Sequence, residues 1–284
     1  TPRITALYKV VENNNIRLSY QTAYRFPSNQ QQWINLVLPG YNLIGGNKNF
    51  IDFYKFNSNP VYYQANMLNG QMVQWNYPLQ KPESLSSFEL GYKGLLMKSK
   101  LFIDMYGYYG NYTNFTARTF VVQSKTGVPL TPADALTGQV YSVPINAPDK
   151  LETWGYGLGL NYILPKGFNV GMNLASDNLN DVPVYIISSF NSPDLKVNAS
   201  FGNSGFGPGK RVGFNVAYRW QASFYYQGDL ANGTLPAVQT VDAQISYKLP
   251  STKSILKLGA NNLLNQYYYN GVGNAYVGGL YYLS

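Results

Sequence analysis

The sequence predicts an all-β protein, specifically a transmembrane antiparallel β-barrel, on three observations. Apolar and polar residues alternate strictly in several segments of the chain. Aromatic residues make up 16% of the chain and charged residues 12%, whereas ordinary globular domains carry about 25% charged residues. Connections between the alternating segments are by turns short and long. These features are typical of a barrel wall with lipid on one side and water on the other.

Eleven segments have the length and composition of β-strands. They are residues 3–11, 15–25, 84–93, 98–113, 151–163, 167–176, 194–203, 211–221, 237–249, 253–262 and 276–284. Short connections follow the first, third, fifth, seventh and ninth of these segments, and long ones follow the others. Since barrels place short turns in the periplasm and long loops outside the cell, residues 26–83 are expected to be extracellular and residues 250–253 periplasmic.

The alternation assigns a face to most strands, because a period of two separates the two sides of a sheet. In 15–25, Ile16 and Leu18 are expected to face lipid, and Arg17 and Arg25 to face the lumen. In 98–113 the pattern is weaker, since Phe102, Tyr106 and Tyr108 share a face with Asp104.

The strand 151–163 places Trp154 and Tyr156 toward lipid and three glycines, Gly155, Gly157 and Gly159, toward the lumen. Glycine in a strand marks either close packing against the wall or strand curvature, and the sequence favours neither interpretation.

The strands 211–221, 237–249 and 253–262 repeat this pattern. Val216 is expected to face lipid, while Asn215, Arg219 and Lys257 face the lumen. The last of the eleven strands is 276–284, and the eleven strands together do not close into a barrel. An open edge cannot lie in lipid, so the chain is expected to be part of a larger closed barrel.

Several classes of function are disfavoured by composition. The chain has no histidine and no cysteine, so it lacks the commonest general base and any thiolate metal ligand. Carboxylate pairs such as Asp177 and Asp181 are best interpreted as part of a solvated loop. We therefore expect no enzyme, no catalytic residue, no metal and no cofactor. The basic residues behind the net charge of +8 are scattered along the chain, which argues against nucleic-acid binding. They could instead line a pore, contact lipopolysaccharide or attract an anionic partner.

Three stretches carry a family resemblance: LSYQTAYRFPSN (18–29), KPESLSSFELGYKG (81–94), and LGANNLLNQYY with YVGGLYYLS within 258–284. In this order they resemble the C-terminal half of the barrel of TonB-dependent outer-membrane receptors. The sequence of these stretches is most similar to that of receptors of the Bacteroidetes, including SusC-like transporters. One departure is the end at Leu283-Ser284, where the family usually ends on an aromatic residue.

This resemblance implies that residues 1–284 are the C-terminal part of a 22-strand barrel, with the N-terminal plug and first strands absent. It implies location in the bacterial outer membrane, contact with outer-membrane lipid, coupling to TonB through the missing N-terminal region, and a SusD-like surface lipoprotein as partner. The implied function is import of a nutrient such as an oligosaccharide, peptide or metal chelate. The alternative is a receptor-like barrel that no longer transports and serves as a structural subunit of an outer-membrane complex.

Candidate substrate-binding residues lie in the loops and the lumen: Arg25, Trp33, Trp75, Arg219 and Tyr267. The aromatic members could stack on a sugar or peptide. Equally, loop aromatics could form an interfacial girdle or pack loop against loop.

Overall fold

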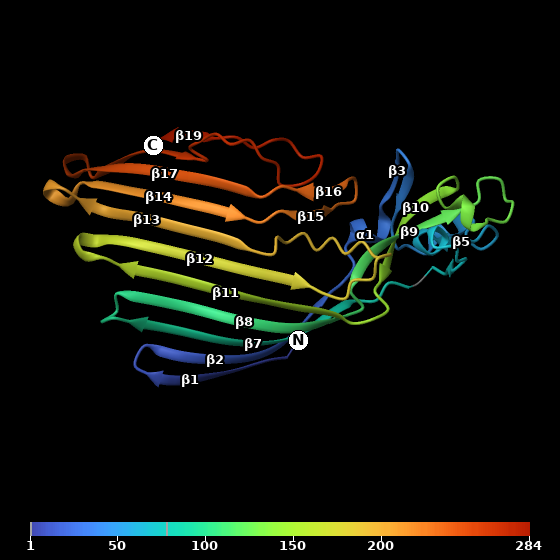
Figure 1. The fold of residues 1–284 in the computed structure, drawn as a ribbon, viewed down its shortest axis with the longest axis horizontal. Coiled ribbons are helices and arrows are strands. Elements are labelled where there is room, and N and C mark those ends of the chain that lie inside the picture. The colour runs from blue at the N-terminus through green and yellow to red at the C-terminus, as the bar shows by residue number, and fades with distance from the viewer. Residues whose placement is uncertain (1, 78) are drawn as a thin grey trace.

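A computed structural model describes residues 2–77 and 79–284 of the protein. Its main feature is one antiparallel sheet of eleven strands (Figure 1). In sheet order the strands are β1 (Arg3–Val11), β2 (Asn14–Arg25), β7 (Glu83–Leu96), β8 (Leu101–Thr113), β11 (Leu151–Ile163), β12 (Phe168–Leu179), β13 (Lys196–Phe206), β14 (Val212–Gln221), β17 (Val238–Leu249), β18 (Ser254–Asn261) and β19 (Leu280–Leu283). Each strand pairs with its predecessor in this order, so the predicted eleven-strand wall is confirmed.

Strand bounds differ from prediction mainly where tight turns intervene. β8 begins at Leu101 rather than at residue 98, because Met97, Lys98 and Ser99 all adopt positive φ and form a turn. β12 continues to Leu179, three residues beyond the predicted end. The last strand keeps only four residues, Leu280–Leu283.

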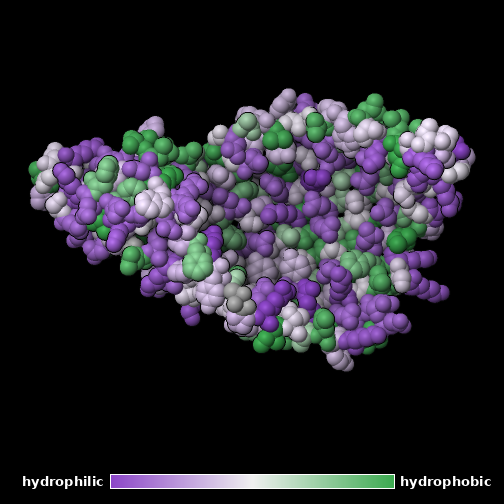
Figure 2. Space-filling view, turned by 180° about the vertical axis from the view of Figure 1, so that it is seen from behind, coloured by the Kyte–Doolittle hydropathy of each residue, from purple (hydrophilic) through white to green (hydrophobic). Residues whose placement is uncertain are grey.

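The two faces of the sheet follow the predicted alternation. Leu18, Val216 and Leu258 are 55%, 41% and 57% exposed on the face assigned to lipid. On the other face, ion pairs join neighbouring strands: Arg17 with Glu89, Lys93 with Asp104 and Arg219 with Asp242. Seen from behind, hydrophilic side chains occupy the middle of the sheet and hydrophobic ones gather along its upper and lower outlines (Figure 2).

Two of the three inward glycines of β11, Gly155 and Gly157, are explained by close packing of tyrosine rings. A Cβ on Gly155 would lie 2.6 Å from Tyr108 Cε1, and a Cβ on Gly157 would lie 2.5 Å from Tyr106 Cε1. Tyr106 and Tyr108 therefore lie on the polar face with Asp104, which resolves the ambiguity of this strand. Only hydrogen leaves room for the rings against the wall.

The two longest connections were predicted as loops, but together they build a second sheet. Its order is β3-β4-β10-β9-β5-β6. The strands are β3 (Asn35–Leu38), β4 (Tyr41–Ile44), β5 (Val61–Tyr63), β6 (Gln74–Trp75), β9 (Thr116–Gln123) and β10 (Gln139–Asn146). We call this six-stranded sheet the loop sheet. It lies beyond one end of the eleven-stranded sheet, at the right of Figure 1.

Short helices and one hairpin complete the structure. The α-helices are α1 (Asn29–Trp33), α2 (Asn49–Phe53) and α3 (Gln64–Leu68); the 3-10 turns are η1 (Pro132–Ala135), η2 (Pro165–Gly167), η3 (Pro208–Lys210) and η4 (Pro250–Thr252). The hairpin joins β15 (Phe224–Gln227) to β16 (Asn232–Leu235). Within residues 2–77 and 79–284, no helix is long and apolar enough to cross a membrane.

The loop sheet holds the main hydrophobic core of the molecule. Ile44, Val121, Val143 and Leu151 are fully buried, and partly buried aromatic rings pack around them. Some apolar residues of the longest connection, such as Leu43, Ile44 and Val61, are buried, whereas others, such as Val37 and Phe53, remain exposed. This core gives the long connections a fixed shape above the barrel wall.

Candidate substrate-binding site

A cavity of about 530 Å³ lies between the loop sheet and the rim of the eleven-stranded sheet. The rim contributes Arg25 and Glu83, from the ends of β2 and β7, and the loop sheet contributes Arg118 from β9. Ser188 and Phe190, from the connection between β12 and β13, close another side. Four separate parts of the chain therefore form one cavity at the mouth of the barrel wall.

The buried carboxylate of Glu83 fastens the loop sheet to the rim. Its Oε2 accepts a hydrogen bond from Arg25 Nη2 at 2.8 Å and another from the backbone N–H of Thr116 at 2.8 Å. The Glu83 side chain is 8% exposed, whereas that of Arg25 is 55% exposed. Arg25 consequently retains guanidinium donors that open into the cavity, since one guanidinium carries five.

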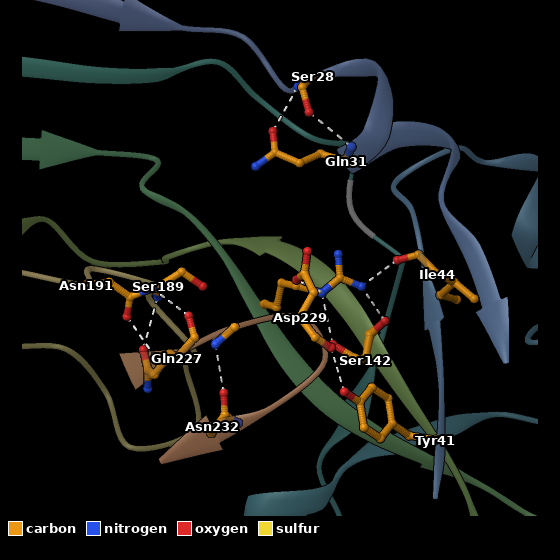
Figure 3. A network of polar contacts seen from close by, with 12 residues as sticks. Ser28, Gln31, Tyr41, Ile44, Ser142, Ser189, Asn191, Gln227, Asp229 and Asn232 are labelled. Atoms are coloured by element: carbon orange, nitrogen blue, oxygen red, sulfur yellow. Dashed lines mark hydrogen bonds and ion pairs between the residues drawn. The ribbon is translucent and has the colours of Figure 1, made fainter. Parts of the chain in front are cut away.

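Arg118 forms the centre of a polar network whose partners Ile44, Ser142 and Asp229 are labelled in Figure 3. Its Nη2 donates to the carbonyl oxygens of Ile44 at 2.7 Å and Ser142 at 2.6 Å, and its Nε donates to Ser142 Oγ at 2.9 Å. Nε also lies 3.8 Å from Asp229 Oδ1, in the β15–β16 hairpin. Tyr41 Oη donates to the backbone oxygen of the same Asp229 at 2.6 Å.

Burial lowers the pKa of the Arg118 guanidinium to about 10, against the opposing attraction of Asp229. At neutral pH the group is still protonated and keeps all its donors. The network therefore ties β4, β10 and the β15–β16 hairpin into one unit around the cavity.

A second hollow, of about 440 Å³, continues from the cavity down the polar face of the wall. The two share Tyr112 and Phe190. The lower one is lined by Glu89, Tyr108 and Asp177. Tyr108 Oη donates to Asp177 Oδ1 at 2.7 Å. The two hollows are neighbours, and carboxylates, hydroxyls and aromatic rings line both of them.

This lining suits a ligand with many hydrogen-bonding groups and apolar faces. In the part of the chain that the structure describes, no group of three or more His, Cys, Asp or Glu side chains could hold a metal ion. The lining residues offer a solute hydrogen bonds, charge and aromatic contact.

The structure brings only one of the five predicted residues into this cavity among the parts it describes. Arg25 lines the cavity. Trp33 ends α1 and is 60% exposed, beside the cavity-lining Gln30 and Gln31. Arg219 lies on the polar face of β14, paired with Asp242 at 2.6 Å. Tyr267 is 67% exposed in the connection between β18 and β19.

The position of Trp75 corrects its interpretation as a stacking platform. Its side chain is 3% exposed and packs edge-on against Phe56 and Tyr77 in the core of the loop sheet. A ring enclosed in this way has no free face for a ligand. For Trp75 the packing of loop against loop, which the sequence left open, describes the geometry.

Sequence reasoning missed the residues that organise the site. Asp177 was placed in a solvated loop, but it belongs to β12 and accepts a hydrogen bond from Tyr108. Glu83 and Arg118 were not selected. The one available signal was the rarity of charge in this chain, because an isolated charged residue within an apolar segment needs a partner when buried.

The fold and the site define the class of protein. A sheet with an apolar outer face, a polar inner face and a structured loop end is the wall of an outer-membrane β-barrel. Residues 1–263 match the family described as TonB dependent receptor-like, beta-barrel. The chain belongs to this family of outer-membrane β-barrels.

Solved structures with the same fold share little sequence with the chain. The pyoverdine outer-membrane receptor FpvA from Pseudomonas aeruginosa PAO1, bound to pyoverdine, aligns with a TM-score of 0.61 at 14% identity, covering 99% of this chain and 35% of that one. The copper transporter OprC aligns with a TM-score of 0.61 at 14% identity, covering 94% and 34%. The siderophore receptor PiuA from Acinetobacter baumannii aligns with a TM-score of 0.56 at 14% identity, covering 99% of this chain and 34% of that one.

The chain thus spans about a third of the length of these receptors. No curated protein sequence matches it.

Proposed function

We propose that this chain forms wall, rim and capturing loops of a TonB-coupled import receptor, with the cavity beneath the loop sheet as its first binding site. The observation that carries the proposal is that this cavity adjoins the polar hollow on the wall, with Tyr112 and Phe190 between them. A solute released by Arg25 and the loop side chains would pass these two rings and then meet Glu89, Tyr108 and Asp177. Coupling to TonB is inferred from the family alone.

The substrate is a nutrient rich in hydrogen-bonding groups, such as an oligosaccharide, a peptide or a metal chelate. The lining supports each class: carboxylates and hydroxyls can bind sugar hydroxyls, peptide amides or the polar groups of a chelator. Among the solved structures with this fold, FpvA is a pyoverdine receptor and OprC is a copper transporter, which supports including a metal chelate among the candidates.

The test is uptake by the complete receptor in its own outer membrane. Cells receive a labelled oligosaccharide, peptide or ferric chelate, with the TonB gene intact or deleted. We expect one class to be taken up only when TonB is present. Arg25→Gln should lower that uptake at least tenfold at unchanged receptor level, while Lys125→Ala, an exposed loop change outside the cavity, should not. If deletion of the TonB gene changes the uptake of none of the three labelled compounds, the non-transporting structural role is supported instead.

We also propose, from the resemblance to SusC-like receptors, that a SusD-like surface lipoprotein covers the loop sheet. Support comes from its exposed apolar side chains: Val37, Phe53 and Leu136 are 76%, 68% and 74% exposed. Gentle purification of the complete receptor should recover the lipoprotein, and Val37→Glu with Leu136→Glu should lose it. Recovery of the receptor alone would leave packing within the loops as the full role of this segment.

A further inference from the structure

Charge is distributed unequally between the two ends of the eleven-stranded sheet. At the end with long connections, cationic and anionic residues balance. The cationic residues there are Lys48, Lys55, Lys81, Arg118, Lys125 and Lys150, and the anionic residues are Asp52, Asp134, Asp149, Asp181, Asp194 and Asp229.

The five short turns at the other end are residues 12–13, 97–100, 164–167, 207–211 and 250–253. They carry the cationic residues Lys98, Lys100, Lys166, Lys210, Arg211 and Lys253. Glu12 is their one carboxylate. The turn end therefore accounts for most of the net charge of +8, and hydrophilic side chains project there, at the right of Figure 2.

Four of the turn lysines have a left-handed backbone conformation, which glycine or asparagine adopts more readily than lysine. Lys98, Lys166, Lys210 and Lys253 have φ of 56°, 64°, 51° and 53°. Left-handed backbone favours glycine or asparagine, because a Cβ crowds the following carbonyl. Asn13, in the first turn, follows that preference with φ of 61°. A lysine with this backbone conformation recurs in four of the five turns, so each of these turns carries an ammonium group.

Carboxylates do not neutralise these lysines. Within residues 2–77 and 79–284, Lys93 is the one lysine that lies within 4.0 Å of a carboxylate oxygen. The turn lysines are thus available to an external anion.

Three lysines converge on a hollow between two of the turns. It has a volume of about 840 Å³ and is lined by Lys166, Lys210 and Lys248. Gly205 lies at its base, where a Cβ would be 3.3 Å from Lys248 Nζ and 2.8 Å from the carbonyl oxygen of Lys210. Asn203 Nδ2 donates to the Lys166 carbonyl oxygen at 3.0 Å, which fixes that turn beside the hollow.

An aromatic cluster adjoins the hollow on the lipid-facing side. Phe168 and Phe206 line it and continue into Phe201 and Phe214. Ring centroids lie 5.7 Å apart for Phe168 and Phe201, 5.4 Å for Phe201 and Phe214, and 5.7 Å for Phe206 and Phe214. Aromatic rings at this depth of a barrel mark the boundary between headgroups and acyl chains.

We propose that this hollow binds the phosphate headgroup of an anionic phospholipid in the periplasmic leaflet. Lys166 and Lys210, in the turns, contact the phosphate, and the phenylalanine cluster contacts the glycerol and upper acyl chains. Lys248 alternates with the lipid-facing Tyr247 and Leu249 in β17, so it reaches the same hollow from the polar face of the wall and adds its charge there. Cations beside an apolar aromatic surface favour a lipid over a soluble anion, because a lipid has both a charged headgroup and apolar acyl chains. Basic residues near an anionic membrane surface each strengthen binding roughly fivefold.

The test counts lipids retained by the complete receptor after purification in detergent. Native mass spectrometry compares added phosphatidylglycerol with phosphatidylethanolamine, in the absence of any transport substrate. The turn variant carries Lys166→Gln, Lys210→Gln and Lys248→Gln. A control variant carries Lys48→Gln, Lys55→Gln and Lys125→Gln, which makes the same charge change at exposed positions on the loop end. Reduced gel mobility on boiling verifies that each variant folds.

We expect the receptor and the control variant to retain phosphatidylglycerol preferentially, and the turn variant to lose that preference by tenfold or more. Inorganic phosphate at millimolar concentration should not displace the lipid. Equal retention by receptor and turn variant, or loss in the control variant alone, overturns the proposal, and displacement by phosphate identifies a soluble anion site instead. Because no substrate is present, these outcomes do not depend on the import function.

Discussion

Tyr141 shows how a single buried hydroxyl links the stability of the loop sheet to pH. Its Oη donates to Gln123 Oε1 at 2.9 Å, and burial raises its pKa to about 12. An unfolded tyrosine ionises near pH 10. The folded pKa is the higher one, so the stabilisation from neutral Tyr141 is complete below about pH 10 and is lost as the pH rises toward 12.

We therefore expect the loop sheet of the complete receptor to unfold more readily as the pH rises from 10 to 12. The fluorescence of buried Trp75, taken as the difference from a Trp75→Phe variant, reports this transition. Tyr141→Phe should make the dependence on pH shallower, while Tyr225→Phe, an exposed ring, should leave it unchanged. An identical slope in all three proteins would show that Tyr141 does not titrate with unfolding.

Gly157 and Gly107 form a matched pair on neighbouring strands. A Cβ on Gly157 would meet the Tyr106 ring at 2.5 Å, whereas a Cβ on Gly107 would find its nearest neighbour at 3.8 Å. We expect Gly157→Ala to destabilise the barrel by about 1–3 kcal/mol through overpacking, and Gly107→Ala to have little effect. Urea unfolding followed by gel mobility measures both. Adding Tyr106→Ser to the Gly157→Ala variant should restore the lost stability. If it does not, the strain arises from a contact other than the Tyr106 ring.

Residues on the wall could be assigned from sequence more reliably than residues of the site. Arg17 and Arg219 were placed on the polar face by alternation alone, and both form ion pairs there. Trp75 could not be placed, because its burial depends on Phe56 and Tyr77 within the loop sheet. Alternation reports which side of a strand a residue occupies, but not which distant segment packs over it.

At the level of elements, β14 offers the sharpest test of the two faces. Val216 is 41% exposed on the apolar face, and Asn215 lies next to it on the polar face. Val216→Arg should destabilise the receptor in lipid by about 2–4 kcal/mol if it lies near the bilayer midplane. Asn215→Arg should be tolerated. The measurement is unfolding in lipid vesicles, and equal damage from both would indicate a segment buried on two sides.

The short strands and the pairing of the loop sheet explain why this second sheet escaped prediction. β3 and β4 have four residues each and β6 has two, so none is long enough to show a period of two. β10 pairs with β4 in parallel, and the two come from different connections. A parallel pairing leaves no hairpin signal in the sequence. The wall strands, at eight to fourteen residues apart from the last, carry their pattern within themselves.

For the whole molecule, the orientation in the membrane follows from the placement of loops and turns. The loop sheet is expected outside the cell, and the turn at 250–253 in the periplasm. The chain has no cysteine, so Asn69→Cys and Ser251→Cys each introduce a single label site in this part of the receptor. Both positions are exposed. An impermeant maleimide should label Asn69→Cys in intact cells and Ser251→Cys only after lysis, and the reverse pattern would invert the orientation.

The interleaving of the loop sheet has a consequence for how such receptors diversify. β9 and β10 belong to one connection but lie between β4 and β5 of another. Extracellular loops of a rigid scaffold generally vary independently, yet a genetic exchange that replaced residues 26–82 alone would leave β9 and β10 with mismatched neighbours. We therefore expect a chimaeric receptor to fold best when both connections are exchanged together, with crossover points before β2 and after β11.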